Sequence, residues 1–229
     1  MKTLFKPLLV LAVTAIAFTS CMKSNDDTDY EAEYLKQEKA LDSLFTAERT
    51  TIQSYLNGND EYEWEEDTVT ISLPRLGKTI KRGIWYTVLA EPTSEDDLYE
   101  YKAQNVGYGQ YQIVAPSNVK LKYSVYSLTS TTPLKEDAVG SDYNFASTNT
   151  HLTSAWFIGF SPYTVKFNGE NVDLGLFAGL TEKGLHKGSK IRILAPSYWS
   201  VNPYTNQKTA SYLPSNAPVI YEFEVLEIE

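Results

Sequence analysis

This chain has a single cysteine and only two histidines in 229 residues. One cysteine excludes an intrachain disulfide, and the histidines, His151 and His186, lack a neighbouring cysteine or the spacing of a zinc site. Basic residues are also scarce, because 20 Lys and Arg stand against 29 Asp and Glu, a formal net charge of −9. This balance disfavours binding to nucleic-acid phosphates or anionic lipid headgroups. We expect no metal and no cofactor.

The apolar run at the N-terminus, residues 8–18, is too short to span a bilayer, since a transmembrane helix needs roughly 20 apolar residues. Lys2 and Lys6 before this run and small residues after it predict an export signal in residues 1–20. Cys21 follows at once, in the position of the acceptor cysteine of a bacterial lipoprotein. The alternative, a free thiol, would be a reactive liability outside the cytoplasm. We therefore expect Cys21 to carry acyl chains such as palmitate that hold the protein at a membrane.

Residues 21–29 are polar, which predicts a flexible tether. Within this tether, residues 23–27 resemble the acidic signal that follows the lipid cysteine in surface-displayed lipoproteins of the Bacteroides group. A plain solvated spacer is the alternative interpretation. The N-terminus thus predicts a lipoprotein of the cell envelope, in the outer membrane, facing either the periplasm or the cell surface.

An amphipathic helix is expected over residues 30–58. Its apolar residues recur at helical spacing, with charged residues between them: Tyr34, Leu41, Phe45, Ile52 and Leu56. Asn57-Gly58-Asn59 ends the pattern. We expect the helix to pack on the following domain in preference to forming a homodimer.

Strand patterns dominate the rest of the chain, which we assign to one domain over residues 67–229. Alternating or β-branched and aromatic segments cover residues 68–73, 83–89, 119–128, 189–195 and 219–228. Gly107-Tyr108-Gly109 is a lone motif in a polar loop and reads as a turn. The acidic run at residues 63–67 reads as a solvated face.

The order of segments after Gly179 resembles one known family. Gly179-Leu180 leads into an expected short helix at residues 181–187, a strand ended by Pro196, a loop and the closing strand at residues 219–228. This order resembles the FKBP-type peptidyl-prolyl isomerase domain. The resemblance implies an α+β fold in which an FKBP-like curved antiparallel sheet wraps around a short helix, here after the N-terminal amphipathic helix. Residues 190–195 and 219–228 would be partners in that sheet, and residues 93–116 would be a long insertion.

The resemblance also implies a cleft that binds a proline-containing peptide or unfolded protein and, where complete, isomerises the prolyl bond without a cofactor. The positions that correspond to its catalytic residues are Tyr123, Phe145, Leu180 and Tyr221. Those that correspond to its substrate-binding residues are Leu176, Phe177 and Leu213. Leu180 stands where the family has the tryptophan of the pocket floor. Ala146 and Ser200 stand where it has an acidic residue and a flap tyrosine. The alternative is that the aromatic residues of this set only fill the core.

Aromatic residues in the expected loops leave a second function open. Aromatic faces stack on sugars as well as on peptides, so the chain could be a surface glycan-binding or structural β-rich lipoprotein without catalysis. The residues that support this interpretation are Tyr99, Tyr101, Tyr108, Tyr111, Trp156, Tyr198, Trp199 and Tyr204.

Overall fold

The computed structural model describes residues 29–59, 61–92, 99–147, 152–203 and 210–229. The predicted signal in residues 1–20, the lipidation site Cys21 and most of the tether lie outside the described residues, as do His151 and Tyr204. Within the described ranges, no helix combines the length and the apolar character needed to cross a membrane.

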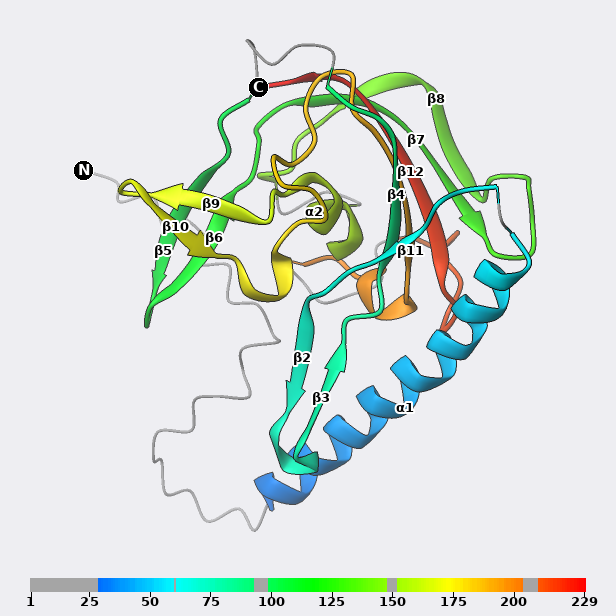
Figure 1. The fold of residues 1–229 in the computed structure, drawn as a ribbon, viewed down its shortest axis with the longest axis vertical. Coiled ribbons are helices and arrows are strands. Elements are labelled where there is room, and N and C mark those ends of the chain that lie inside the picture. Colours follow the sequence, from blue (N-terminus) through cyan, green and yellow to red (C-terminus); the bar gives the residue numbers. More distant parts are fainter. Residues whose placement is uncertain (1–28, 60, 93–98, 148–151, 204–209) are drawn as a thin grey trace.

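A six-stranded antiparallel sheet forms the body of the molecule (Figure 1). Its strands, in spatial order, are β1 (Glu65–Glu66), β4 (Trp85–Ala90), β11 (Lys190–Ala195), β12 (Val219–Ile228), β7 (Val119–Ser127) and β8 (Lys135–Tyr143). In the centre, Ile193 of β11 pairs with Tyr221 of β12, and Phe223 of β12 pairs with Tyr123 of β7. The predicted partnership of residues 190–195 and 219–228 is therefore confirmed.

Helix α2 (Ser154–Phe160) lies inside the curve of this sheet (Figure 1), and all of its residues are buried. Gly159 allows the close approach, because a Cβ there would lie 2.5 Å from Cδ1 of Ile193 and 3.6 Å from Cε2 of Phe223. The predicted α+β fold, a curved antiparallel sheet around a short helix, is confirmed. The predicted place of the helix is wrong, since residues 181–187 form no helix.

The helix lies earlier in the chain than the predicted residues 181–187, and a hairpin separates the two segments. This hairpin consists of β9 (Thr164–Phe167) and β10 (Glu170–Asp173), and a 3-10 turn at Gly175–Phe177 follows it. The order of segments in the family does not include these elements, so the prediction based on it placed the helix too close to the C-terminus.

Helix α1 (Tyr30–Asn57) is the predicted amphipathic helix, which is confirmed. Its first turn is capped by Asp29, whose carboxylate accepts the Ala32 N–H at 3.1 Å. Phe45 is buried in the main core, and Ile52 is buried against Leu194 and Ile220 on the opposite face of the sheet. The helix therefore packs on its own domain and covers one end of the sheet.

Two further hairpins flank the body. β2 (Thr70–Leu73) and β3 (Lys78–Lys81), joined through the 3-10 turn Pro74–Leu76, lie along α1, where the Leu76 N–H donates to Glu38 at 3.0 Å. β5 (Lys102–Gly107) and β6 (Gln110–Val114) pack on the β9–β10 hairpin through a small apolar cluster. The described part of the insertion predicted at residues 93–116 thus forms a second layer that rests on α2's side of the molecule (Figure 1).

Candidate functional site

Aromatic rings gather on the concave face of the sheet. Tyr123 of β7 and Phe223 of β12 are cross-strand partners, so their side chains share one face, and Tyr221 stacks on Phe223 with ring centroids 6.1 Å apart. Trp156 of α2 closes this group, with its ring centroid 4.9 Å from Tyr123 and 4.8 Å from Phe223. We call these four residues, together with Tyr143 and Tyr212, the aromatic cluster.

Tyr143 and Tyr212 are half-buried and form the rim of the cluster. The ring of Tyr143 lies 5.8 Å from Tyr123 and 5.6 Å from Trp156. Burial raises the pKa of the Tyr212 hydroxyl, and the nearby Tyr123 and Tyr221 raise it further. The pKa of Tyr143 is also raised, mainly by burial. At neutral pH both rim residues are neutral phenols that can donate and accept hydrogen bonds.

Tyr221 lies at the bottom of the cluster and is fully buried. Its hydroxyl forms a 2.9 Å hydrogen bond with Oγ of Ser200, and burial raises the pKa of this hydroxyl to about 12. Ser200, which stands where the resemblance expects a flap tyrosine, therefore fixes the orientation of Tyr221.

Trp156 carries an unsatisfied donor. Its side chain is 2% exposed, and its indole Nε1 has no hydrogen-bond partner among the residues that the structure describes. By contrast, Nε1 of Trp199 donates to the backbone oxygen of Arg82 at 2.9 Å. A buried donor without a partner costs about 1–3 kcal/mol, so a ligand carbonyl that accepts from Trp156 would recover part of this cost.

The other predicted catalytic residues lie in the core around the cluster. Phe145 is 1% exposed and packs on Phe160 at 4.7 Å and on Trp156 at 6.2 Å. Leu180 is fully buried in the same core. The ring that packs against Tyr123 is that of Trp156 on α2. The assignment of Leu180 to the position of the family's floor tryptophan stays a prediction.

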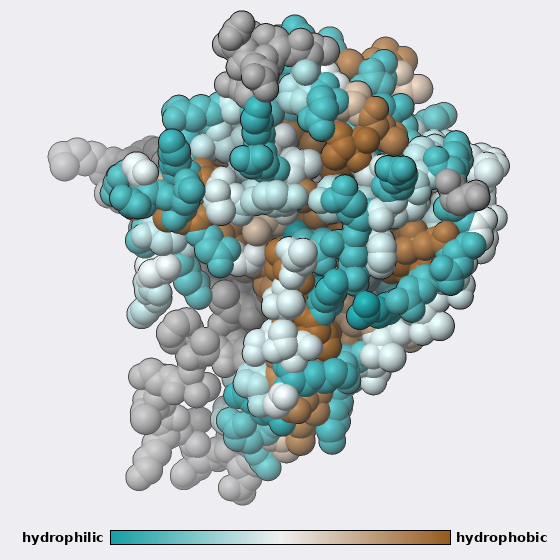
Figure 2. Space-filling view, in the orientation of Figure 1, coloured by the Kyte–Doolittle hydropathy of each residue, from teal (hydrophilic) through white to brown (hydrophobic). Residues whose placement is uncertain are grey.

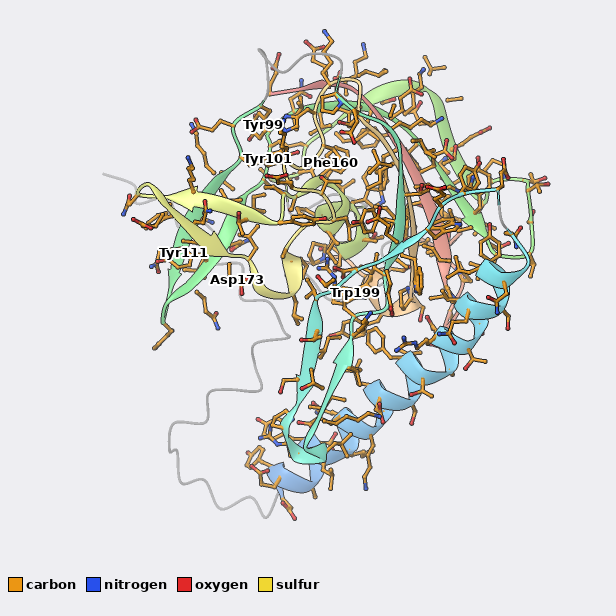
Figure 3. All side chains as sticks on the ribbon, viewed as in Figure 1. Tyr99, Tyr101, Tyr111, Phe160, Asp173 and Trp199 are labelled. Atoms are coloured by element: carbon orange, nitrogen blue, oxygen red, sulfur yellow. The ribbon has the colours of Figure 1, made fainter. Side chains whose placement is uncertain are left out.

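The predicted substrate-binding residues divide between two places. Leu213 is 6% exposed and follows the rim residue Tyr212. Phe177 instead faces Trp199, with ring centroids 6.4 Å apart (Trp199 is labelled in Figure 3). Leu176 lines a separate hollow of about 850 Å³ between α1, β2 and β10, over which Figure 2 shows apolar surface near the β2–β3 hairpin.

The aromatic residues that suggested glycan binding do not form an exposed platform in the described part of the chain. Trp156, Trp199 and Tyr101 are 2%, 1% and 8% exposed. Tyr99 packs edge-on against Tyr101 at 4.9 Å, beside which it is labelled in Figure 3. Tyr108 is exposed, but it lies at the tip of the β5–β6 hairpin.

Sequence reasoning missed the rim residues and the true place of Trp156. One signal was present, because residues 154–160 form a mostly apolar run between Thr153 and Pro162, which indicates a short buried element. For Tyr143 and Tyr212 the sequence holds no comparable signal. Among the residues that the structure describes, no group of three His, Cys, Asp or Glu side chains could hold a metal ion.

Comparison with known proteins gives only distant structural likenesses. No model of a known protein family matches the chain, and no curated protein matches it either. Of the solved structures, FkpA from Escherichia coli is similar with a TM-score of 0.39 and 13% identity, over 87% of this chain and 64% of FkpA. AtFKBP13 is similar with a TM-score of 0.37 and 12% identity, over 64% of this chain and 94% of AtFKBP13. The N-terminal domain of FKBP42 from Arabidopsis thaliana is similar with a TM-score of 0.34 and 11% identity, over 72% of this chain and 95% of that domain. This chain therefore spans less than two thirds of the FkpA chain, and these likenesses carry no residue roles.

Proposed function

We propose that the aromatic cluster binds a proline-containing segment of a peptide or unfolded protein and weakly accelerates isomerisation of the bond before the proline. One observation carries this proposal: the buried, unpartnered indole N–H of Trp156 lies among Tyr123, Phe223 and the half-buried rim. The carbonyl of a peptide unit next to the rotating bond would accept from this N–H, because a donor to the rotating carbonyl itself would strengthen its resonance. The apolar proline ring would rest on the neighbouring aromatic faces.

The chemistry asks little of the protein. Rotation about a peptide bond has a barrier of about 18–20 kcal/mol, because resonance gives the C–N bond double-bond character. That resonance form is charge-separated and solvated by water, so a dry aromatic surface weakens it and favours the twisted amide. A hydrogen bond that forms only in the twisted state contributes about 0.5–1.5 kcal/mol, and 1.36 kcal/mol corresponds to about tenfold in rate. No nucleophile is required.

The test measures cis-to-trans rates of a Leu-Pro and a Phe-Pro peptide with and without protein. Tyr123→Phe removes only one hydroxyl from the aromatic cluster, and Trp156→Leu removes the indole. Tyr126→Phe is the matched control, because Tyr126 lies on the same strand β7 but faces away from the cluster. We expect acceleration by the native protein, a decrease of about threefold or more in Tyr123→Phe, and no change in Tyr126→Phe.

Three outcomes are separable. Acceleration that falls in Tyr123→Phe and Trp156→Leu supports an isomerase, provided that both variants keep the native circular dichroism spectrum. Saturable binding without acceleration leaves a peptide-binding module and removes the enzyme. The proposal would be overturned if the peptides neither bind nor change their isomerisation rate at high micromolar protein.

We also propose that the chain is exported and held in the outer membrane of the cell envelope by an acylated Cys21. The N-terminal sequence pattern alone supports this proposal. In bacterial cells fed labelled palmitate, the native chain should be labelled and should fractionate with membranes, whereas Cys21→Ser should be unlabelled and soluble. An unlabelled, soluble native chain would contradict it. A homodimer through the exposed face of α1 stays a prediction, which sedimentation would test.

A further inference from the structure

Asp137 lies on the concave face of the sheet, next to the aromatic cluster. It is on β8, the edge strand, and its cross-strand partner is Tyr123. Residues directly opposite each other in an antiparallel pair point to the same face, so the carboxylate lies on the side of Tyr123 and Trp156. The Tyr143 hydroxyl donates to Oδ2 of Asp137 at 2.9 Å, which connects the carboxylate to the rim.

A bulge in β8 holds this carboxylate in place. The register between β7 and β8 shifts between Leu121 and Tyr123, and Gly140 has a φ of 96°, a conformation that favours glycine. In this geometry the Gly140 N–H donates to Oδ1 of Asp137 at 2.8 Å. Both carboxylate oxygens are thus oriented by the protein, and the Ser141 hydroxyl and the Val139 N–H also donate to this carboxylate.

The carboxylate is charged, and no cation from the described residues lies beside it. Hydrogen bonds from Ser141 and from the Gly140 N–H lower the pKa of Asp137 to about 2. Within the described ranges no Lys or Arg nitrogen lies within 4 Å of it. Lys135 shares its face two residues earlier but is exposed, and Lys122 faces the other side and pairs with Glu224 at 3.1 Å.

We propose that Asp137 makes the aromatic cluster prefer prolyl segments that carry Lys or Arg within two residues of the proline. The inference rests on the proposed function and names the substrate class of that same site. A side-chain ammonium or guanidinium would be attracted by the fixed negative charge of this carboxylate while the proline ring rests on the aromatic faces. Acidic residues at the same positions would be repelled.

The test compares peptides that differ only around the proline. Lys, Leu or Glu is placed in turn at the two positions before and the two positions after it, and kcat/KM and the dissociation constant are measured. We expect kcat/KM to be about three- to tenfold higher for Lys than for Leu at one or more positions, and lower for Glu than for Leu. Both differences should disappear when the salt concentration is raised from about 50 to about 500 mM.

Two substitutions locate the effect. Asp137→Asn removes the charge but keeps an oxygen for the Gly140 N–H, and it should bring the Lys-to-Leu ratio to about one. Asp142→Asn makes the same change on the same strand, but Asp142 pairs with Lys120 on the other face and should leave the ratio unchanged. Equal affinity for Lys and Leu peptides in the native protein would overturn the inference while the proposed function stands. A preference that survives in Asp137→Asn would also overturn it, and failure to bind any peptide would overturn both.

Discussion

The buried ion pair between Arg82 and Asp67 predicts a large loss of stability when its acid is removed. Arg82 is fully buried. Its Nε donates to the Asp67 carboxylate, and its Nη1 donates to the Leu176 carbonyl at 2.7 Å. Nη2 has no partner. The Arg82 backbone oxygen also accepts the indole N–H of Trp199, so this pair connects the β2–β3 hairpin to the main core.

Asp67→Ala leaves the guanidinium with one neutral acceptor and no opposing charge. Breaking a buried pair in this way costs about 3–5 kcal/mol, a large fraction of the roughly 5–15 kcal/mol that stabilises a typical domain. Burial already lowers the pKa of Arg82, and the Asp67 carboxylate opposes that shift. Asp42→Ala is the matched control, since it breaks an ion pair with Lys78 whose side chains are 25% and 46% exposed. That loss should cost at most about 1 kcal/mol.

Urea unfolding followed by circular dichroism measures both variants. The double variant Asp67→Leu with Arg82→Met should recover most of the loss, because an apolar pair of similar size leaves no buried charge. Equal losses for Asp67→Ala and Asp42→Ala would refute the reasoning, since they would show that solvent reaches Arg82.

Three further stability predictions follow from single contacts. Gly179→Ala should lower the free energy of unfolding by at least about 3 kcal/mol in a thermal melt, because its Cβ would lie 1.5 Å from the Ser161 carbonyl oxygen, and an unchanged melting temperature would contradict the close approach. Tyr221→Phe should cost about 1–3 kcal/mol in urea because it leaves the Ser200 hydroxyl buried without a partner, and a loss below about 0.5 kcal/mol would show that water replaces the phenol. Burial lowers the pKa of His186, so on acidification the unfolded chain binds a proton at this imidazole before the folded chain does. The free energy of unfolding should therefore fall as the pH drops below about 6.5. Urea unfolding at several pH values should show a smaller fall in His186→Gln. A His186→Gln curve parallel to the native one would contradict the buried, neutral imidazole.

The elements that the sequence predicts correctly are those with a clear local period. α1 has charged residues between regularly spaced apolar ones, and buried and half-buried residues alternate over residues 119–126 of β7 and residues 221–226 of β12. The partnership of β11 and β12, however, is a tertiary property, and the resemblance rather than a local pattern predicted it. Helix α2 has neither kind of period because its seven residues are buried on all sides. A run that short reads equally well as a buried strand.

The candidate site shows the same division. Tyr123 and Tyr221 lie on predicted strands, so alternation places both on the inner face. Trp156 depends on the helix that sequence reasoning placed elsewhere. Tyr143 and Asp137 reach the aromatic cluster only because β8 carries a bulge at Gly140, and a period-two pattern cannot show a bulge.

The indole N–H signals of the tryptophans test most directly the claim that Trp156 donates to a bound peptide. The chain has four tryptophans, so ¹H–¹⁵N spectra should show four indole N–H signals, which single Trp→Phe variants assign. Titration with a Leu-Pro peptide should move the Trp156 signal downfield and saturably, because its free N–H gains a carbonyl acceptor. The Trp199 signal should not move, because its N–H already donates to the backbone oxygen of Arg82. The Trp64 signal should not move either, because this unpartnered indole packs with the apolar residues on the opposite face of the sheet. A Trp156 signal that stays fixed, or that moves only together with Trp64, would contradict the account.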